Sequence, residues 1–285
     1  MTNNSNSEPW DEIVVPKNSL LKLNLKEVWK YKDLLTLFVK RDIVAQYKQT
    51  VLGPLWYFIQ PLLTTIMFTI VFGKIANIST DDLPHTIFYM AGVVNWAYFA
   101  DCLNKTATTF KDNQQIFGKV YFPRLIVPLS IVTSHLLKYG IQFVLFLGFY
   151  IYFILIGANI HPNEMALLFP VLVLMLAGLG LGFGLIITSY TTKYRDLVFL
   201  LSFGVQLAMY ATPVIIPLSK LEPKYQRLME LNPMTSIIET FRYGFLGQGT
   251  FSWGALAYTG IFTIVLVLAG IVIFNKTEKN FMDTV

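Results

Sequence analysis

The stretch LKEVWKYKDLLTLFVKRDIVAQYKQTVLGPLWYFIQPLLTTIMFTIVF, from Leu25 to Phe72, joins a basic amphipathic segment directly to a long apolar one. In its first half, apolar residues recur at steps of three and four and lysines occupy much of the remaining surface, a pattern typical of a helix lying along a membrane. From Gln49 to Gly73 the 25 residues carry no charge, which exceeds the roughly 20 residues that a helix needs to cross the hydrocarbon layer. The sequence therefore predicts an interfacial helix over residues 25–52, after which the chain enters a membrane.

Composition places most of the chain in lipid. Apolar residues make up 54% of the 285 residues and charged residues 14%, whereas charged residues are about a quarter of a soluble domain. The formal charge of +5 is explained better by Lys and Arg in cytoplasmic loops than by nucleic-acid binding. The single cysteine, Cys102, excludes an intrachain disulfide and has no nearby Cys or His to suggest a metal site. We therefore expect an all-α integral membrane protein with no metal and no nucleic-acid partner.

Six uncharged apolar runs are candidate transmembrane helices. They are residues 55–72, 86–100, 139–157, 166–188, 197–217 and 253–274. An even number of spans places both termini on one side of the membrane. If that side is the cytoplasm, 17 of the 22 Lys and Arg residues lie inside, as the excess of positive charge in cytoplasmic loops requires. The sequence therefore predicts six spans with both termini in the cytoplasm.

The chain outside the spans divides into tails and loops. A disordered cytoplasmic tail is predicted at residues 1–24, a transmembrane domain at 53–275 and a second cytoplasmic tail at 276–285.

Two connecting segments have an unusual composition. The cytoplasmic segment 104–134 alternates apolar and basic residues, which predicts an interfacial or docking helix broken at Pro123. The outer segment 218–250 is too polar to span the membrane and too apolar to be free in water. Two short re-entrant half-helices hinged at Asn232 and Pro233 fit it, because irregular backbone at membrane depth requires protein or water around it.

Ionisable residues near the spans favour structural roles. The three histidines lack the spacing of metal ligands, and no nucleophilic serine is flanked by the glycines of a hydrolase turn. Asp101, at the end of the second span, is expected to form a local ion pair rather than a proton relay. Glu239 and Arg242 are three residues apart on an outer helix and can face each other. Structural pairing is the favoured interpretation, and contact with a solute on the outer side is the alternative.

Four glycines at every second position, from Gly178 to Gly184, superficially suggest a phosphate-binding loop. No Gly-Lys-Ser/Thr follows them and they lie inside a predicted span, so close approach of helices is the better interpretation.

Aromatic residues make up 15% of the chain and several lie within spans. Anchoring at the membrane interface or helix packing is the favoured interpretation for most of them. A pore lined by rings, whose faces stack against sugars, is the alternative that the residues leave open.

Five motifs in the same order resemble the permease subunit of ABC exporters of the polysaccharide and polyol phosphate export family, which has the type-2 ABC fold. The resemblance covers nearly the whole chain after about Leu20. The motifs are RDIVAQYKQTVLGPLW (41–56), KVYFPRLIVPLS (119–130), KYRDL (193–197), NPMTSIIETFRYGFLG (232–247) and EKNFMDTV (278–285).

The resemblance implies a homodimer of six-span permeases in the bacterial inner membrane, bound on the cytoplasmic side by two copies of a separate ATPase. The chain itself would hold no cofactor and hydrolyse nothing, because the partner would bind ATP and Mg²⁺. The surface that couples to the ATPase would comprise Gln115, Phe117, Lys119, Tyr121, Arg124, Arg195 and Asp196. The channel would be lined by Trp56, Tyr57, Phe58, Phe203 and Tyr210, with Glu239 and Arg242 in the outer re-entrant segment.

The leading hypothesis is therefore export of a lipid-linked polysaccharide, such as an O-antigen or capsular chain, in contact with membrane lipids. A teichoic-acid or small-amphiphile exporter is the alternative within transport. A membrane-bound glycan-modifying enzyme is the alternative from another class, and it would need a cluster of acid, base or nucleophile that the sequence does not display.

Overall fold

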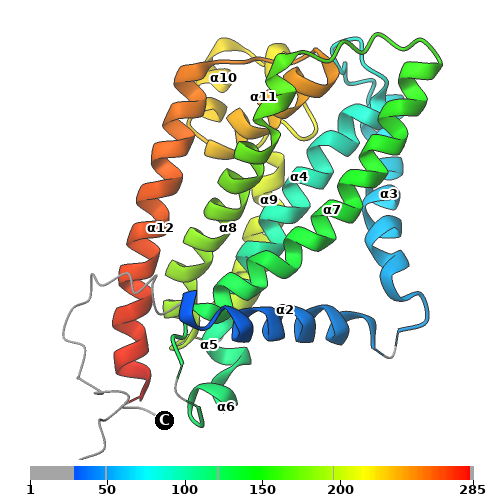
Figure 1. Cartoon of the computed structure of the whole chain (residues 1–285). Coiled ribbons are helices and arrows are strands. Elements are labelled where there is room, and N and C mark those ends of the chain that lie inside the picture. Colours follow the sequence, from blue (N-terminus) through cyan, green and yellow to red (C-terminus); the bar gives the residue numbers. More distant parts are fainter. Residues whose placement is uncertain (1–28, 49, 121, 195, 283–285) are drawn as a thin grey trace, which may run out of the picture.

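The computed structural model describes residues 29–48, 50–120, 122–194 and 196–282, and within these ranges it contains helices and no β-strand. Figure 1 shows a bundle of long helices standing over one helix that lies across its base, α2 (Lys32–Tyr47). The long helices are α3 (Trp56–Phe68), α4 (His85–Thr106), α7 (Ile126–Leu155), α8 (Phe169–Thr191), α9 (Leu197–Tyr210) and α12 (Trp253–Met282). The prediction of an all-helical protein is confirmed.

Four segments among the described residues are long and apolar enough to cross a membrane: Gly53–Ile75, Ile126–Leu155, Glu164–Thr191 and Trp253–Glu278. The first of them comprises a short 3-10 turn (Gly53–Leu55), α3 and a π-helical turn (Thr69–Ile75). These four segments overlap the first, third, fourth and sixth predicted spans, but the third begins 13 residues earlier than predicted, at Ile126, inside the segment predicted as the cytoplasmic loop 104–134. The second and fifth predicted spans correspond to α4 and α9, which differ from the others in polarity and length.

Helix α4 is long enough to span but less apolar than its neighbours. Its 22 residues extend about 33 Å at 1.5 Å per residue. It packs against α3, α7, α8, α9 and α11 (Pro233–Leu246), and most of its side chains are buried. Because protein rather than lipid surrounds α4, it tolerates polar residues such as Asn95, whose amide oxygen accepts a hydrogen bond of 2.9 Å from the Tyr139 hydroxyl.

Two further predicted boundaries change. Helix α9 has 14 residues and ends at Tyr210. Residues 211–217, predicted as the end of the fifth span, therefore lie outside this helix. Helix α12 continues to Met282, so the tail predicted at 276–285 begins inside a helix. No Gly or Pro interrupts residues 275–282, and the helix therefore extends beyond its apolar part.

The glycines of α8 allow close helix packing on two sides. A Cβ atom on Gly180 would lie 2.6 Å from the Cβ of Cys102 on α4, and one on Gly178 would lie 2.5 Å from a methyl carbon of Thr263 on α12. Such distances are shorter than side-chain carbons can approach, so both sites need glycine. The prediction that these glycines permit close helix approach is confirmed.

Helix α2 covers one end of the bundle with its apolar face. Its Phe38 ring is buried and lies 5.7 Å from the Phe122 ring, centre to centre. Tyr31, Leu34 and Leu35 pack against the same cluster of apolar residues. The residues on the opposite side of the helix, including Leu37 and Val44, are exposed. The apolar residues that recur at steps of three and four in this segment therefore pack on the bundle. A second apolar strip of the helix stays uncovered.

Candidate functional site

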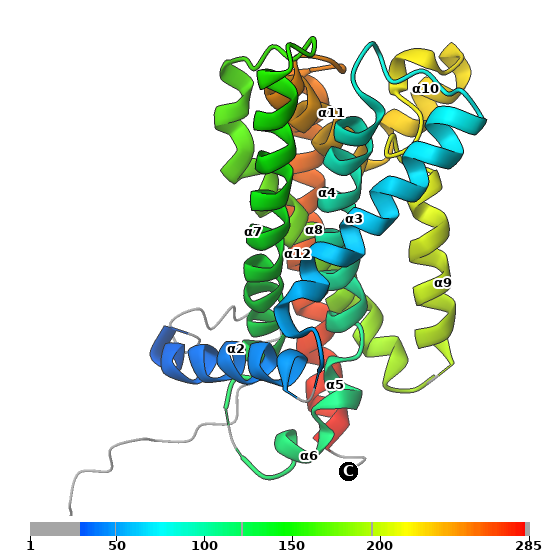
Figure 2. The same ribbon diagram turned by 90° about the vertical axis from the view of Figure 1, so that its right-hand side faces the viewer.

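The connection between α4 and α7 projects beyond the bundle on the side of α2 (Figures 1 and 2). It contains two four-residue helices, α5 (Thr109–Asp112) and α6 (Gln114–Phe117). The prediction of one docking helix broken at Pro123 is wrong, because helical structure already ends at Phe117. Local side-chain bonds compete with a continuous helix at the junction, where Asn113 Nδ2 donates to the Thr109 carbonyl at 3.0 Å.

Phenylalanine side chains anchor this connection to the bundle. Phe117 is 2% exposed, and its ring lies 5.8 Å from the rings of both Phe110 and Phe122. Phe110 in turn stacks on Phe274 of α12 at 4.7 Å. Phe117, predicted as part of the coupling surface, is thus an internal anchor. A force on α5 and α6 would reach α12 and the segment that leads into α7 through these rings.

Arg124 is also internal, and it joins the connection to the end of α12. Its side chain is 6% exposed, and its guanidinium donates a 3.1 Å hydrogen bond to the Glu278 carbonyl and lies 3.8 Å from the Glu278 carboxylate. Burial lowers the pKa of the Arg124 guanidinium, while the Glu278 carboxylate acts in the opposite direction. Sequence reasoning placed Glu278 at the start of the motif EKNFMDTV but did not pair it with Arg124.

The surface at this end is formed by the polar members of the predicted set. Gln115, Lys119 and Asp196 are exposed, while Tyr121 and Arg195 lie outside the described residues. The predicted coupling residues therefore divide into exposed polar groups and the buried anchors Phe117 and Arg124. Their coupling role stays a prediction.

The predicted channel residues lie on two helices that occupy one side of the molecule, α3 and α9 (Figure 2). Both helices pack against α4. Phe203 and Tyr210 of α9 are 59% and 56% exposed, and Trp56 is also exposed. Phe58 is half-buried. The fold thus presents Trp56, Phe203 and Tyr210 outward, with Trp56 near the base of the bundle and Tyr210 near its far end, rather than in one cluster.

Tyr57 points instead into the bundle, where it meets an ion pair. The Lys138 ammonium donates to the Asp101 carboxylate at 2.6 Å and lies 5.5 Å from the centre of the Tyr57 ring. This contact joins α3, α4 and α7. The expectation that Asp101 forms a local ion pair is confirmed.

The segment opposite α2 contains two short helices, α10 (Pro223–Glu230) and α11. They are separated at Asn232, whose side chain caps α11 by accepting a hydrogen bond from the Met234 amide at 3.0 Å. The prediction of two short helices hinged at Asn232 and Pro233 is confirmed in its helix boundaries. At the other end, α11 stops at Gly247 with φ of 75°, a left-handed conformation that favours glycine.

Glu239 and Arg242 form the expected pair, and both are buried. Their side chains are 3% and 1% exposed, with 3.5 Å between the guanidinium and the carboxylate. The second carboxylate oxygen of Glu239 accepts a hydrogen bond from the Thr250 amide at 2.9 Å. Burial at this depth favours the structural interpretation of the pair, because a solute on the outer side cannot reach it.

Arg242 also holds the non-helical chain that follows α9. Its guanidinium donates to the carbonyl of Pro213, to that of Val214 at 3.0 Å and to that of Phe88 on α4 at 3.2 Å. It lies 3.6 Å from the centre of the Phe88 ring. Sequence reasoning found the pair with Glu239 but missed this clamp, since backbone carbonyls leave no signal in a sequence.

Across the described ranges, no three His, Cys, Asp or Glu side chains are grouped so that they could hold a metal ion.

Comparison with known proteins assigns the chain to a family. The ABC-2 type transporter family matches residues 33–246. The chain is similar to the O-antigen export system permease protein RfbA of Myxococcus xanthus, with 26% identity over 92% of this chain and 98% of that protein. It is also similar to RfbA of Klebsiella pneumoniae, with 26% identity over 88% and 94% of the two chains. The polysialic acid transport protein KpsM of Escherichia coli is 21% identical over 86% and 93%. The matched range runs from α2 to the end of α11 and contains both short-helix segments described above, so the chain belongs to the ABC-2 type transporter family.

Proposed function

We propose that this chain is the permease subunit of an ABC exporter that moves a lipid-linked polysaccharide, of the O-antigen or capsular type, across the bacterial inner membrane. ATP hydrolysis takes place in a separate nucleotide-binding subunit. The observation that carries the proposal is the near full-length similarity to permeases named for O-antigen export and polysialic acid transport. The fold supports it with spanning helices and an internally anchored connection at one end.

The proposed topology has six spans, with α4 and α9 as the second and fifth. The 14 residues of α9 cover about 21 Å, short of the roughly 30 Å hydrocarbon core. We assign the remaining depth to residues 211–217 and to α10 and α11, which act as re-entrant half-helices. Protein supplies hydrogen-bond donors to the non-helical backbone here, since Arg242 donates to the Pro213 and Val214 carbonyls, and such partners are the condition for irregular backbone inside a membrane.

The side that carries α2, α5 and α6 is assigned to the cytoplasm. The excess of Lys and Arg in the segments placed there supports this orientation. With six spans, both termini lie on that side.

The ATPase docks on the surface formed by α5, α6 and the α8–α9 turn. Gln115, Lys119 and Asp196 supply exposed polar contacts. Phe117 and Arg124 transmit the movement, because their contacts reach α7 and α12. ATP and Mg²⁺ are bound by the partner, and two ATPase copies serve a permease homodimer.

The two permeases meet around the side occupied by α3 and α9. Exposed apolar side chains on this side, including Ile66 and Met67 of α3 and Leu207 of α9, supply a surface for a second copy. Trp56, Phe203 and Tyr210 then face the central path of the glycan, where aromatic rings can contact sugar rings without holding them tightly. Tyr57 and Phe58 lie behind them.

Reconstitution with the co-encoded ATPase in proteoliposomes tests the proposal. ATPase activity and ATP-dependent movement of a lipid-linked glycan are expected only when both subunits are present. In the native cell, loss of this chain is expected to remove the surface polysaccharide and to leave its lipid-linked form on the cytoplasmic side. Failure of the chain to bind any ATPase would overturn the exporter assignment. Export of a teichoic acid or a small amphiphile, with surface polysaccharide unchanged, would replace the proposed substrate.

A further inference from the structure

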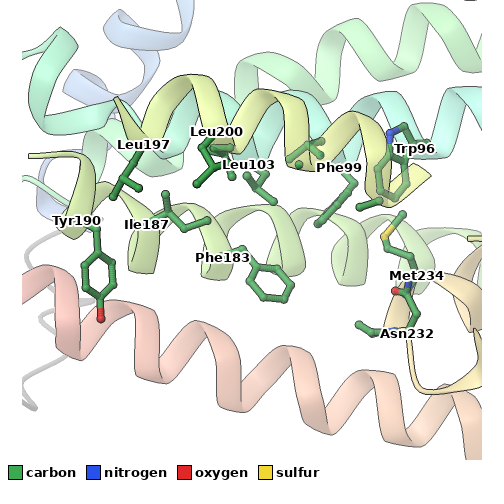
Figure 3. Close-up of a pocket in the computed structure, with 15 residues that line it drawn as sticks. Trp96, Phe99, Leu103, Phe183, Ile187, Tyr190, Leu197, Leu200, Asn232 and Met234 are labelled. Atoms are coloured by element: carbon green, nitrogen blue, oxygen red, sulfur yellow. The ribbon is translucent and has the colours of Figure 1, made fainter. Parts of the chain in front are cut away.

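An apolar slot separates α9 from the rest of the bundle. Its volume is about 520 Å³, within the roughly 300–1,000 Å³ range of ligand pockets. Figure 3 shows that Phe183 and Ile187 of α8 and Leu197 and Leu200 of α9 line it from two sides, with Phe99 of α4 beside them. The lining is hydrocarbon along its length, and polar atoms are confined to the end regions.

The slot is elongated along α9, as a hydrocarbon chain requires. Along α9 its lining extends from Leu197 to Ala208, which is eleven residue steps or about 16 Å at 1.5 Å per residue. That length is about half of the roughly 30 Å hydrocarbon core. It therefore matches a lipid tail from one leaflet.

Space inside the slot is open at Gly204. A Cβ atom built on this glycine would meet no other atom within 4 Å. The glycine is therefore not required by a close neighbour, in contrast to Gly178 and Gly180 of α8. A larger side chain at Gly204 would project into the slot without a backbone clash.

A cationic side chain belongs to the turn at the end of the slot that faces the α2 side. Tyr190 and Leu197 line this end, and Lys193 in the turn between them is exposed. An ammonium group at this level complements the phosphate of a lipid whose tail runs along α9.

We propose that this slot binds one acyl tail of a phospholipid from the leaflet on the α2 side, with the phosphate near Lys193. The membrane supplies this lipid wherever the protein resides, and an apolar cavity takes up apolar molecules rather than water. The bound tail fills the space between α8 and α9. It thereby supports α9, which otherwise packs on α4 along a limited length. The proposed orientation decides only which leaflet supplies the lipid. The site does not depend on the identity of the exported substrate.

Fluorescence of Trp96 tests the site, because Trp96 lines the slot and is only 6% exposed. A variant with Trp10, Trp29, Trp56 and Trp253 replaced by Phe leaves Trp96 as the single reporter. It is reconstituted into vesicles of phosphatidylethanolamine and phosphatidylglycerol with plain or brominated acyl chains. Bromine quenches an indole that it contacts, so Trp96 fluorescence is expected to fall at least about two-fold in brominated vesicles if the cavity takes up the tail.

Gly204→Leu in the same background is expected to remove most of this quenching, because its side chain occupies the slot. Gly148→Leu on α7 is the matched control, since a Cβ there also meets no atom within 4 Å and it lies outside the slot; quenching should persist. A companion background, in which Trp253 instead of Trp96 is the single tryptophan, carries the same glycine substitutions; quenching of its exposed Trp253 verifies that each variant is folded and inserted.

Three results would overturn the proposal. The first is absence of Trp96 quenching while Trp253 is quenched, as expected if protein covers the slot. The second is equal quenching in Gly204→Leu. The third is recovery of Trp96 fluorescence when a few percent of polyprenyl phosphate is added, which would make the prenyl carrier the occupant. None of these readouts requires transport, so a failure of the export proposal is distinguished from a failure of this one.

Discussion

Replacing Arg242 by Met tests whether the clamp between α11 and the chain after α9 holds together the end of the bundle opposite α2. Methionine keeps a long apolar stem but removes the guanidinium. The change leaves Glu239, 3% exposed, without its cation. It also leaves the carbonyls of Pro213, Val214 and Phe88 without this donor.

The expected loss of stability follows from these contacts. Removing one partner of a buried ion pair costs about 3–5 kcal/mol, because an uncompensated charge stays buried. At about 2–4 °C per kcal/mol for a chain of this size, the unfolding midpoint should fall by about 6–20 °C. A double variant, Glu239→Gln with Arg242→Met, should recover only part of this loss. It removes the buried negative charge, but the three carbonyls still lack their donor.

Thermal unfolding in lipid nanodiscs, followed by circular dichroism, measures both effects. Arg227→Met is the matched control, because Arg227 is exposed on the neighbouring helix α10, and a change within about 0.5 kcal/mol is expected there. If Arg242→Met unfolds at the same temperature as Arg227→Met, the clamp does not stabilise the fold. Full recovery in the double variant would show that neutralising Glu239 is the whole role of Arg242.

Three further substitutions separate anchors from exposed groups. Arg124→Glu should stop export, measured by surface-polysaccharide immunoblot, and lower the free energy of unfolding by about 1–3 kcal/mol, because it brings a carboxylate to Glu278 in a buried site. Membrane insertion should persist. Adding Glu278→Arg should restore part of the export. Normal export by the single variant would contradict this. Tyr210→Ala should slow export in proteoliposomes and change the free energy of unfolding by less than about 0.5 kcal/mol, since the ring is exposed. Unchanged export by this variant would leave Tyr210 without a role in the path. Tyr57→Ala, in contrast, should lower the unfolding midpoint. Gly180→Leu should destabilise by about 1–3 kcal/mol or more through overpacking, and an unchanged unfolding midpoint would refute the close approach of α8 to α4.

The helices were predictable from sequence where lipid contact demands a long apolar run. The candidate spans that contain α3, α7, α8 and α12 match predicted spans because their exposed surfaces are apolar. Helix α4 was found at a shorter length, since protein surrounds it and polar residues are tolerated there. The break at Asn232 was visible because Asn before Pro is a helix-start signal.

The candidate site was predicted less completely, because burial decides its chemistry. Phe117 and Arg124 belong to a mixed apolar and basic segment that indicates a surface, yet Phe117 packs between Phe110 and Phe122 and Arg124 folds inward on α12. Tyr57 is an interface aromatic by sequence, but it packs on Lys138. For Arg124 and Tyr57 the partner lies on a helix far along the chain, and no local period reports it.

The sequence by itself determined the environment, the order of the long helices and the helical break at Asn232, since these depend on hydropathy, charge and backbone preference within a few residues. The tertiary structure alone decided which side of each helix is buried, that Arg242 binds the carbonyls of residues 213 and 214, and that an open slot remains beside Gly204. These features arise from side chains of different helices meeting in space. Residues as far apart as Phe88 and Arg242 come into contact there, and that proximity is a property of packing rather than of any segment.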